Sequence, residues 1–291
     1  MIEQPHPTLQ DKPAPSRLPH LLTRLPVYGV LVLWTLFAVV AIGWIVLASL
    51  STTREIFSNT LLASGLHFEN YLNALTTLNM GRYFFNTVWY VGIALVLIAL
   101  ISAPAAYALS RFEFRGRRTI NTAMLSAQAI PGVMLVIPMF TLFLKLDLVN
   151  TITGLVLIYV GTSIPFTVFF LSGFFSTLPR ELEEAAMIDG CTEVQAFWKV
   201  MLPLSQPGLV TVTIFNFVNL WNEYFWALIF VNSPEKRTLS IGLEALLQSM
   251  RYTGDWAGLF ASVMIVVVPT LILYIFLSEK IVAGITAGAV K

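Results

Sequence analysis

The chain is poor in charged residues, which make up 11% of its 291 residues, whereas hydrophobic residues make up 57%. Soluble domains carry about 25% charged residues, so this composition excludes a single water-soluble globule. The 17 basic and 16 acidic residues nearly cancel, and the formal charge of +1 offers no basic surface of the kind that binds nucleic acid. The low charge and the mean hydropathy of +0.78 indicate an integral membrane protein.

Residue types that carry catalysis or bind metals are also scarce. Cys191 is the only cysteine, which excludes a disulfide framework and a multi-cysteine metal site. None of the six lysines follows a glycine, so the sequence has no Walker-type phosphate loop, and it has no HExxH or GxSxG motif. We therefore expect no catalytic residue, no metal site and no cofactor in this chain, and we expect that it is not an enzyme.

Six stretches that lack any charged residue predict the transmembrane helices. Each is at least 23 residues long, and a bilayer core about 30 Å thick needs about 20 apolar residues of helix. The predicted fold is an all-α integral membrane protein with six transmembrane helices, near residues 27–50, 84–108, 121–144, 152–176, 205–231 and 257–278. Prolines inside these spans predict kinks in a packed bundle: Pro104, Pro131, Pro138, Pro165 and Pro269. The tryptophans of the spans are expected at the membrane interfaces or facing lipid: Trp34, Trp44, Trp89 and Trp226.

The distribution of basic residues predicts the orientation. Eleven of the 17 Lys and Arg residues lie on the side that holds both termini, and six lie on the other side, so both termini are expected in the cytoplasm. The cluster 111–118 contributes four of the eleven, and we expect it to anchor the topology and to contact anionic headgroups. Residues 1–25 are rich in proline and lack a periodic apolar face, which predicts a flexible cytoplasmic N-terminal tail. Residues 26–280 then form one membrane domain, and residues 281–291 form a cytoplasmic C-terminal tail.

The loop 178–203, between the fourth and fifth predicted spans, has the most informative sequence. Pro179 suits a first helical position, and the glutamates that follow it place negative charge where the helix dipole favours it. Gly190 suits the left-handed residue after a helix, and Thr192 with Gln195 forms a capping box for a second helix. The loop is therefore expected to be a helix–turn–helix outside the bilayer.

The side chains of this loop favour a contact with a partner. Pro203 is expected to end the segment before the next span. Ala185 and Ala186 present little bulk and let another surface approach, while Phe197 and Trp198 are large apolar anchors of the type that dominates interfaces. The alternative is an amphipathic connector that rests on the lipid headgroups.

The same residues carry a family resemblance. The loop resembles the EAA loop of the permease subunits of bacterial ABC importers, through Glu184-Ala185-Ala186, Asp189-Gly190, Leu202-Pro203 and Pro207-Gly208. Cys191 stands where that family commonly has alanine. Three further segments resemble the MalG-like half of the carbohydrate-uptake class: Trp221-Asn222-Glu223, the run Ser233 to Leu243, and the ending Ile285 to Lys291. The resemblance covers the chain from about residue 25 to its end.

The resemblance implies a membrane-spanning permease subunit that forms half of the pathway for a sugar in an ATP-driven importer of the bacterial inner membrane. The implied partners are a second, MalF-like permease, a dimer of cytoplasmic subunits that hold ATP and Mg, and an extracytoplasmic sugar-binding protein. The residues implied to couple to the ATPase subunit are Glu184, Ala185, Ala186, Asp189 and Gly190. Residues of the C-terminal tail would reach toward the nucleotide-binding dimer: Thr286, Ala287 and Gly288.

Glu223 is a carboxylate inside a predicted span, where a charge costs about 2.5–3.5 kcal/mol at the helix centre. Sugars need hydrogen-bonding groups and an aromatic face, and its neighbourhood offers both: Asn219, Trp221, Asn222, Glu223 and Tyr224. This cluster is either a contact with the substrate or a packing element between helices or toward the partner permease. Two alternative functions are an importer for another solute, such as glycerol phosphate or a polyamine, and a self-contained carrier in which Glu223 binds the coupling ion.

Overall fold

The computed structural model describes the backbone of residues 17–289 and the side chains of residues 26–277 except that of Arg251. Within these ranges all regular elements are helices, as predicted. The chain divides into two compact units, residues 1–47 and 48–291, and each is described by itself. Residues 1–16 of the expected N-terminal tail, and the side chains of residues 17–25, lie outside the described part.

The first unit is formed by helix α1, Arg17–Ser49, whose last two residues belong to the second unit. Its apolar part, Pro26–Ser49, is 24 residues long and can cross a membrane. The backbone of residues 17–25, part of the expected tail, continues this helix.

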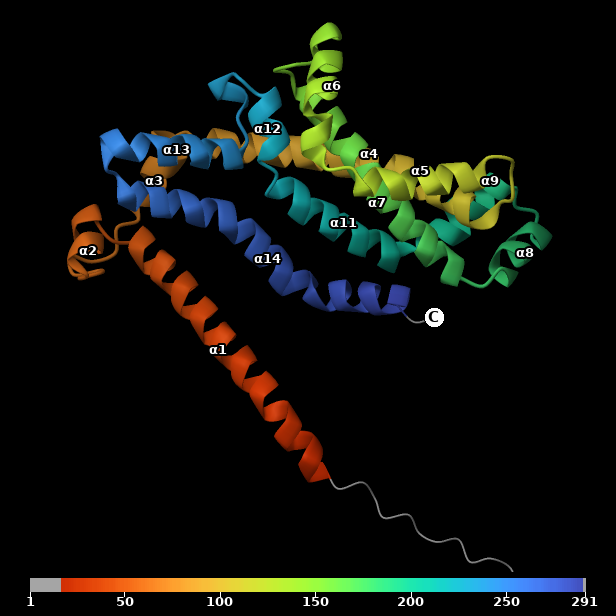
Figure 1. The fold of residues 1–291 in the computed structure, drawn as a ribbon, viewed down its shortest axis with the longest axis horizontal. Coiled ribbons are helices and arrows are strands. Elements are labelled where there is room, and N and C mark those ends of the chain that lie inside the picture. The colour runs from red at the N-terminus through yellow and green to blue at the C-terminus, as the bar shows by residue number, and fades with distance from the viewer. Residues whose placement is uncertain (1–16, 290–291) are drawn as a thin grey trace, which may run out of the picture. The chain divides into compact units, whose positions relative to one another are not determined.

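The second unit contains all the other elements (Figure 1). In chain order they are α2 Thr53–Ser58, α3 Glu69–Thr76, α4 Met80–Arg111, α5 Arg117–Ala129, α6 Gly132–Lys145, α7 Ile152–Thr177, α8 Glu181–Ile188, α9 Glu193–Ala196, the π-helix η1 Phe197–Met201, α10 Leu202–Leu204, α11 Gln206–Trp221, α12 Phe225–Phe230, the 3-10 helix η2 Pro234–Lys236, α13 Leu239–Thr253 and α14 Trp256–Ala289.

Four helices are long and apolar enough to cross a membrane by themselves: α1, α4, α7 and α14. The third predicted span is two helices, α5 and α6, which meet at 105° (Figure 1). Pro131 lies between them in an extended conformation, with φ −61° and ψ 130°. It therefore breaks the span rather than kinking it, because proline cannot donate a helical hydrogen bond. The other prolines predicted to kink spans lie inside helices that continue.

The fifth predicted span is also interrupted. Helix α11 ends at Trp221, and α12 begins at Phe225, so Glu223 lies in a turn and not within a continuous helix. At its other end, α11 meets the helical segment 193–204 at 71°. The bend falls at Ser205, whereas Pro203 lies inside α10. The segment therefore ends at Leu204 and not at Pro203 as expected.

Helices α4 and α7 form the most extensive helix pair of the second unit. Small residues of α4, Ala94, Ala103 and Ala106, are buried and allow the two backbones to approach closely. Larger side chains such as Leu155 and Tyr159 of α7 fill the space around them. In lipid, van der Waals packing of this kind stabilises a helix pair, because the hydrocarbon removes the hydrophobic driving force between helices.

Polar side chains also link α7 to α11 and to α4. The Asn216 amide of α11 donates to Thr167 Oγ1 of α7 at 2.9 Å, and Ser172 Oγ of α7 donates to the Ala106 carbonyl of α4 at 3.3 Å. Interhelical bonds in membranes contribute about 0.6 kcal/mol each on average. Trp226 is buried too, against the expectation of an interfacial or lipid-facing position, and its ring lies over Gly132.

Candidate functional site

The segment from α8 to α10 contains the residues of the EAA-like string. Helix α8 ends before Gly190, which has a φ of +84°, and the capping box of Thr192 and Gln195 opens α9 with both of its hydrogen bonds. These two predictions are confirmed. Pro179 lies two residues before α8 and not at its first position. The three glutamates of the first turn, Glu181, Glu183 and Glu184, lie where the helix dipole stabilises negative charge.

Four of the five residues implied to couple are exposed, two on α8 and two directly after it. Glu184, Ala185, Asp189 and Gly190 are exposed, whereas Ala186 is 6% exposed and faces the chain itself. Two apolar residues, Met187 and Ile188, are also exposed, and Ile188 is 86% accessible. The residues that the EAA-like string marks do not include these two, although large apolar residues beside such a string are a signal for an interface.

Phe197 has a different role from the one expected. It is 4% exposed, and its ring centroid lies 4.9 Å from that of Tyr107 of α4 and 6.4 Å from that of Phe175 of α7. Phe197 therefore anchors the segment to this chain's own helices, because its ring is enclosed by them. Trp198 remains 49% exposed and stays available to a partner.

The π-helix η1 ends at Met201, two residues before Pro203. In this turn the Leu202 N–H donates to the Phe197 carbonyl, five residues earlier. Proline lacks the N–H that a regular helical turn needs, and the wider turn before it accommodates Pro203 without ending the helix. Single π-turns are often found at functional sites, but no pattern in the sequence predicted this one.

Arg111, the last residue of α4, joins three elements at the base of α8. Its Nη2 donates to the Leu178 carbonyl at the end of α7, at 2.7 Å, and its Nε lies 2.8 Å from Glu183 Oε1 in the first turn of α8. The two side chains are only 4% and 12% exposed. Burial raises the pKa of the Glu183 carboxyl, and the charges of Arg111 and Arg180 act against that rise. The expected role of Arg111 at lipid headgroups is therefore wrong, because its guanidinium is turned inward.

Glu223 holds the turn between α11 and α12. Its carboxylate accepts hydrogen bonds from the Trp226 N–H at 2.6 Å, the Ala227 N–H at 3.1 Å and the Tyr159 hydroxyl of α7 at 3.0 Å. Three donors of this chain thus occupy both oxygens. The arrangement is a helix cap tied to α7, which accords with the packing alternative for this residue.

The neighbours of Glu223 divide into buried and exposed residues. Trp221 is buried, and its indole Nε1 donates to the Val266 carbonyl of α14 at 3.0 Å. Asn219, Asn222 and Tyr224 are exposed. Asn219 and Asn222 lie three residues apart and therefore share one face near the end of α11. These three are the polar groups that a substrate or a partner helix can reach.

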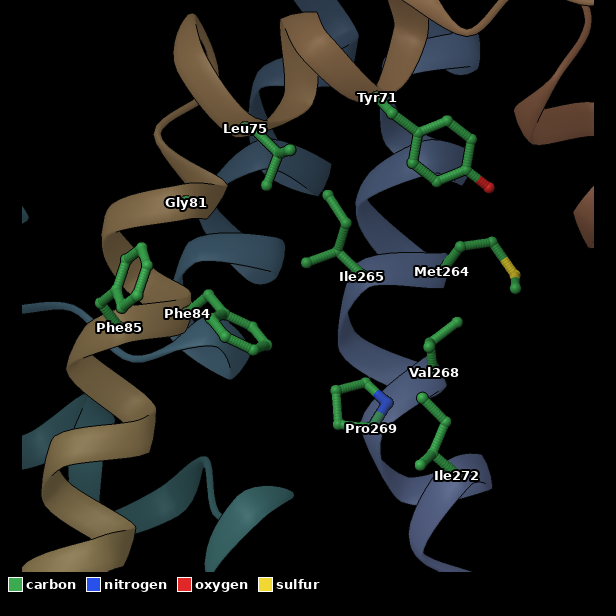
Figure 2. A pocket seen from close by; sticks show the side chains of 10 residues that line it. All are labelled: Tyr71, Leu75, Gly81, Phe84, Phe85, Met264, Ile265, Val268, Pro269 and Ile272. Carbon is green, nitrogen blue, oxygen red and sulfur yellow. The ribbon is translucent and has the colours of Figure 1, made fainter. Parts of the chain in front are cut away.

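An apolar groove of about 550 Å³ lies between α3, α4 and α14 (Figure 2). Its lining contains Leu75, Phe84, Ile265 and Val268, and the only side chain with a polar atom is Tyr71. Such a surface offers almost no hydrogen bonds to a sugar, so we do not assign the groove to the solute pathway. Among the described residues, no group of three or more His, Cys, Asp and Glu side chains could hold a metal ion.

The residues of the C-terminal tail named above are only partly described. The backbone of Thr286, Ala287 and Gly288 continues helix α14, and their side chains lie outside the described part. Their predicted contact with a nucleotide-binding dimer therefore stays a prediction.

Known proteins resemble the chain over most of its length. A diacetylchitobiose uptake system permease protein of Streptomyces coelicolor is 39% identical over 91% of this chain and 88% of the relative. An arabinooligosaccharides transport system permease protein of Halalkalibacterium halodurans is 37% identical over 85% and 89%. A trehalose transport system permease protein of Mycobacterium tuberculosis is 32% identical over 88% and 93%.

A solved structure shares the fold. One chain of a bacterial ABC transporter that imports the acidic polysaccharide alginate matches with a TM-score of 0.77 and 24% identity, over 92% of this chain and 99% of that one. Residues 95–282 match the family described as binding-protein-dependent transport system inner membrane component. The chain therefore belongs to this family, the permease subunits of ABC importers.

Proposed function

We propose that this chain forms half of the translocation pathway for a sugar and couples to a separate ATPase subunit through α8. The sugar assignment is supported by the relatives named for diacetylchitobiose, arabinooligosaccharides and trehalose. The observation that carries the coupling assignment is the exposed side of α8, where Glu184 and Ala185 lie beside Met187 and Ile188. A short rigid helix with a small central residue and apolar neighbours is suited to a groove in a soluble partner.

The buried residues of the segment suit this role as well. Ala186 and Phe197 face this chain, and the ring of Phe197 packs on α4 and α7. A force applied to the exposed side of α8 would therefore reach two membrane helices through packed side chains. The helix–turn–helix would act as a lever and not as a loose connector.

The location of the partners follows from the orientation. The side with eleven of the 17 basic residues holds both termini and the α8 segment, and we assign it to the cytoplasm. The ATPase dimer, with its ATP and Mg, would bind there. A sugar-binding protein would bind at the opposite face, and a second permease would complete the pathway.

For the pathway itself, we assign substrate contact to Asn219, Asn222 and Tyr224, which are exposed. Trp221 and Glu223 instead hold the turn that presents them, through the hydrogen bonds to Val266 and Tyr159. This assignment gives Glu223 no role in binding an ion, because three donors already occupy its oxygens.

The test is uptake by the assembled importer in proteoliposomes, screened with diacetylchitobiose, arabinooligosaccharides and trehalose. We expect ATP-dependent uptake of one of these sugars, abolished when ATP is withheld. Uptake of glycerol phosphate or a polyamine instead would contradict the sugar assignment. Uptake that survives without ATP and collapses with the ion gradient would contradict the importer assignment.

A further inference from the structure

Arg111 is set apart from the other arginines of its cluster by where its guanidinium lies. Arg115 and Arg118 are exposed, whereas Arg117, the first residue of α5, donates to the Leu109 carbonyl near the end of α4 at 2.8 Å. Arg111 alone among these four reaches two other elements, α7 through Leu178 and α8 through Glu183. The sequence, which presents four similar arginines, does not reveal this difference.

The contact combines a hydrogen bond with an ion pair. Nη2 donates to the carbonyl oxygen at 2.7 Å, and Nε lies 2.8 Å from the carboxylate oxygen without a hydrogen bond between those two atoms. A planar guanidinium presents several donors in a fixed fork, whereas a lysine ammonium is a single point on a flexible stem. The positive charge also complements the negative end of the α7 dipole at Leu178.

The contact lies between the segment assigned to the partner and the ends of two membrane helices. Glu183 directly precedes Glu184-Ala185-Ala186, and its side chain is 12% exposed, whereas Glu184 and Ala185 are exposed. Its surroundings are rigid, because the Tyr107 ring, one turn before Arg111, packs on both Phe175 and Phe197. A displacement of α8 would therefore act on the Arg111–Glu183 ion pair and on the cluster of aromatic rings. Both contacts involve residues of α4 and of the C-terminal part of α7.

We propose that Arg111 is a positioning residue that fixes α8 to the cytoplasmic ends of α4 and α7 and so transfers the movement of the coupling segment to the membrane helices. This inference rests on the proposed function of α8. It adds a specific pair, Arg111 and Glu183, that acts inside the permease and touches neither ATP nor the sugar.

The experiment compares Arg111→Lys, Glu183→Gln and the double variant in the assembled importer. Matched controls are Glu181→Gln, in the same turn of α8, and Arg118→Lys, in the first turn of α5, since both side chains are exposed. Three quantities are measured: the ATPase subunit that copurifies, the ATP hydrolysed, and the uptake of the sugar selected from diacetylchitobiose, arabinooligosaccharides and trehalose. The ratio of sugar transported to ATP hydrolysed reports coupling, which a purely structural role does not change.

We expect assembled Arg111→Lys and Glu183→Gln importers to transport about 3- to 30-fold less sugar per ATP, while both controls match the wild type. The double variant should be no worse than the more affected single variant, because both substitutions break the same contact. An unchanged ratio in the importers that assemble, or an additive double variant, would overturn the inference. A wild-type chain that transports without any ATPase subunit would overturn the proposed function itself, which the wild-type preparation alone reveals.

Discussion

At the scale of single residues, the direction in which a side chain points determines its role. Glu223 and Trp221 have the chemistry of a sugar site, yet both are engaged by groups of their own chain. Ala186 and Phe197 have the chemistry of a docking surface, yet both are buried. The sequence identifies such residues correctly as unusual, but the face on which they lie depends on tertiary packing.

Glu223→Ala is expected to lower stability. The substitution leaves the Tyr159 hydroxyl and the Trp226 and Ala227 N–H groups without their acceptor, and an unsatisfied buried group costs about 1–3 kcal/mol. The midpoint of thermal unfolding of the purified importer should fall, whereas Asn222→Ala, at an exposed neighbour, should leave it nearly unchanged. An unaltered midpoint together with lost gradient-dependent uptake would instead support an ion site at Glu223.

Gly208→Ala is expected to be destabilising for a steric reason. A Cβ at this position would lie 2.5 Å from the Phe174 ring, and overpacking of this kind costs about 1–3 kcal/mol. Gly173→Ala is the matched control, because no atom lies within 4 Å of its added Cβ. The midpoint of thermal unfolding should therefore fall for Gly208→Ala and stay close to that of the wild type for Gly173→Ala. Equal midpoints for the two variants would contradict the packing of α11 on α7.

At the scale of elements, turns and caps that depend on neighbouring residues could be predicted, whereas the interruptions of two predicted spans could not. Gly190 and the capping box of Thr192 act through their immediate neighbours, so the turn between α8 and α9 could be predicted. Pro131 and the turn at Glu223 were expected inside continuous spans, because an apolar run does not show where tertiary contacts replace helical hydrogen bonds. Helix α13 was missed for a related reason. It is short, and its fit depends on the close approach of Gly242 to the Tyr83 ring.

Gly190→Ala is expected to distort the turn after α8. The φ of +84° is unfavourable for residues with a Cβ by about 1–2 kcal/mol, whereas Gly190→Asn should be tolerated better, because asparagine visits this region more readily. Copurification of the ATPase subunit with a tagged chain should fall for the alanine variant more than for the asparagine variant. Equal recovery from all three chains would exclude a role for this turn in docking.

The segment between α1 and α3 is expected to lose local stability at low pH. Hydrogen bonds from the Ser64 hydroxyl, the Thr52 N–H and the Ser64 N–H lower the pKa of Glu55 to about 2. A lowered pKa contributes stability above the ordinary value near 4.5, and this contribution is lost as the pH falls toward 2. The protection of residues 52–70 against hydrogen exchange, taken relative to the intrinsic exchange rate at each pH, should thus be steady from pH 7 to about 5 and should be lost below about 4.

Ser64→Ala tests the cause of that response. The variant removes the hydroxyl that contributes most to the lowered pKa of Glu55, so less protection should be lost on acidification, and the loss should be complete at a higher pH than in the wild type. An equal loss over the same pH range in both chains would mean that another group governs the acid response of this segment.

At the scale of the whole molecule, the sequence and the structure agree on an all-helical membrane protein of the importer permease family. The charge-free stretches predicted where the long helices lie, because the bilayer imposes the same length on each of them. The coupling that we propose between ATPase and pathway was not predictable, because it rests on which side of α8 is buried and on a contact between Arg111 and Glu183, which are 72 positions apart in the sequence.

The measurement that tests the central claim most directly is purification of the tagged chain from its native membrane in mild detergent, with identification of the copurifying subunits and an ATPase assay of the eluate. We predict a second permease and an ATPase subunit, with hydrolysis that is lost or no longer linked to transport when Glu184→Lys is introduced. Recovery of the chain alone, stable and without ATPase activity, would contradict the account.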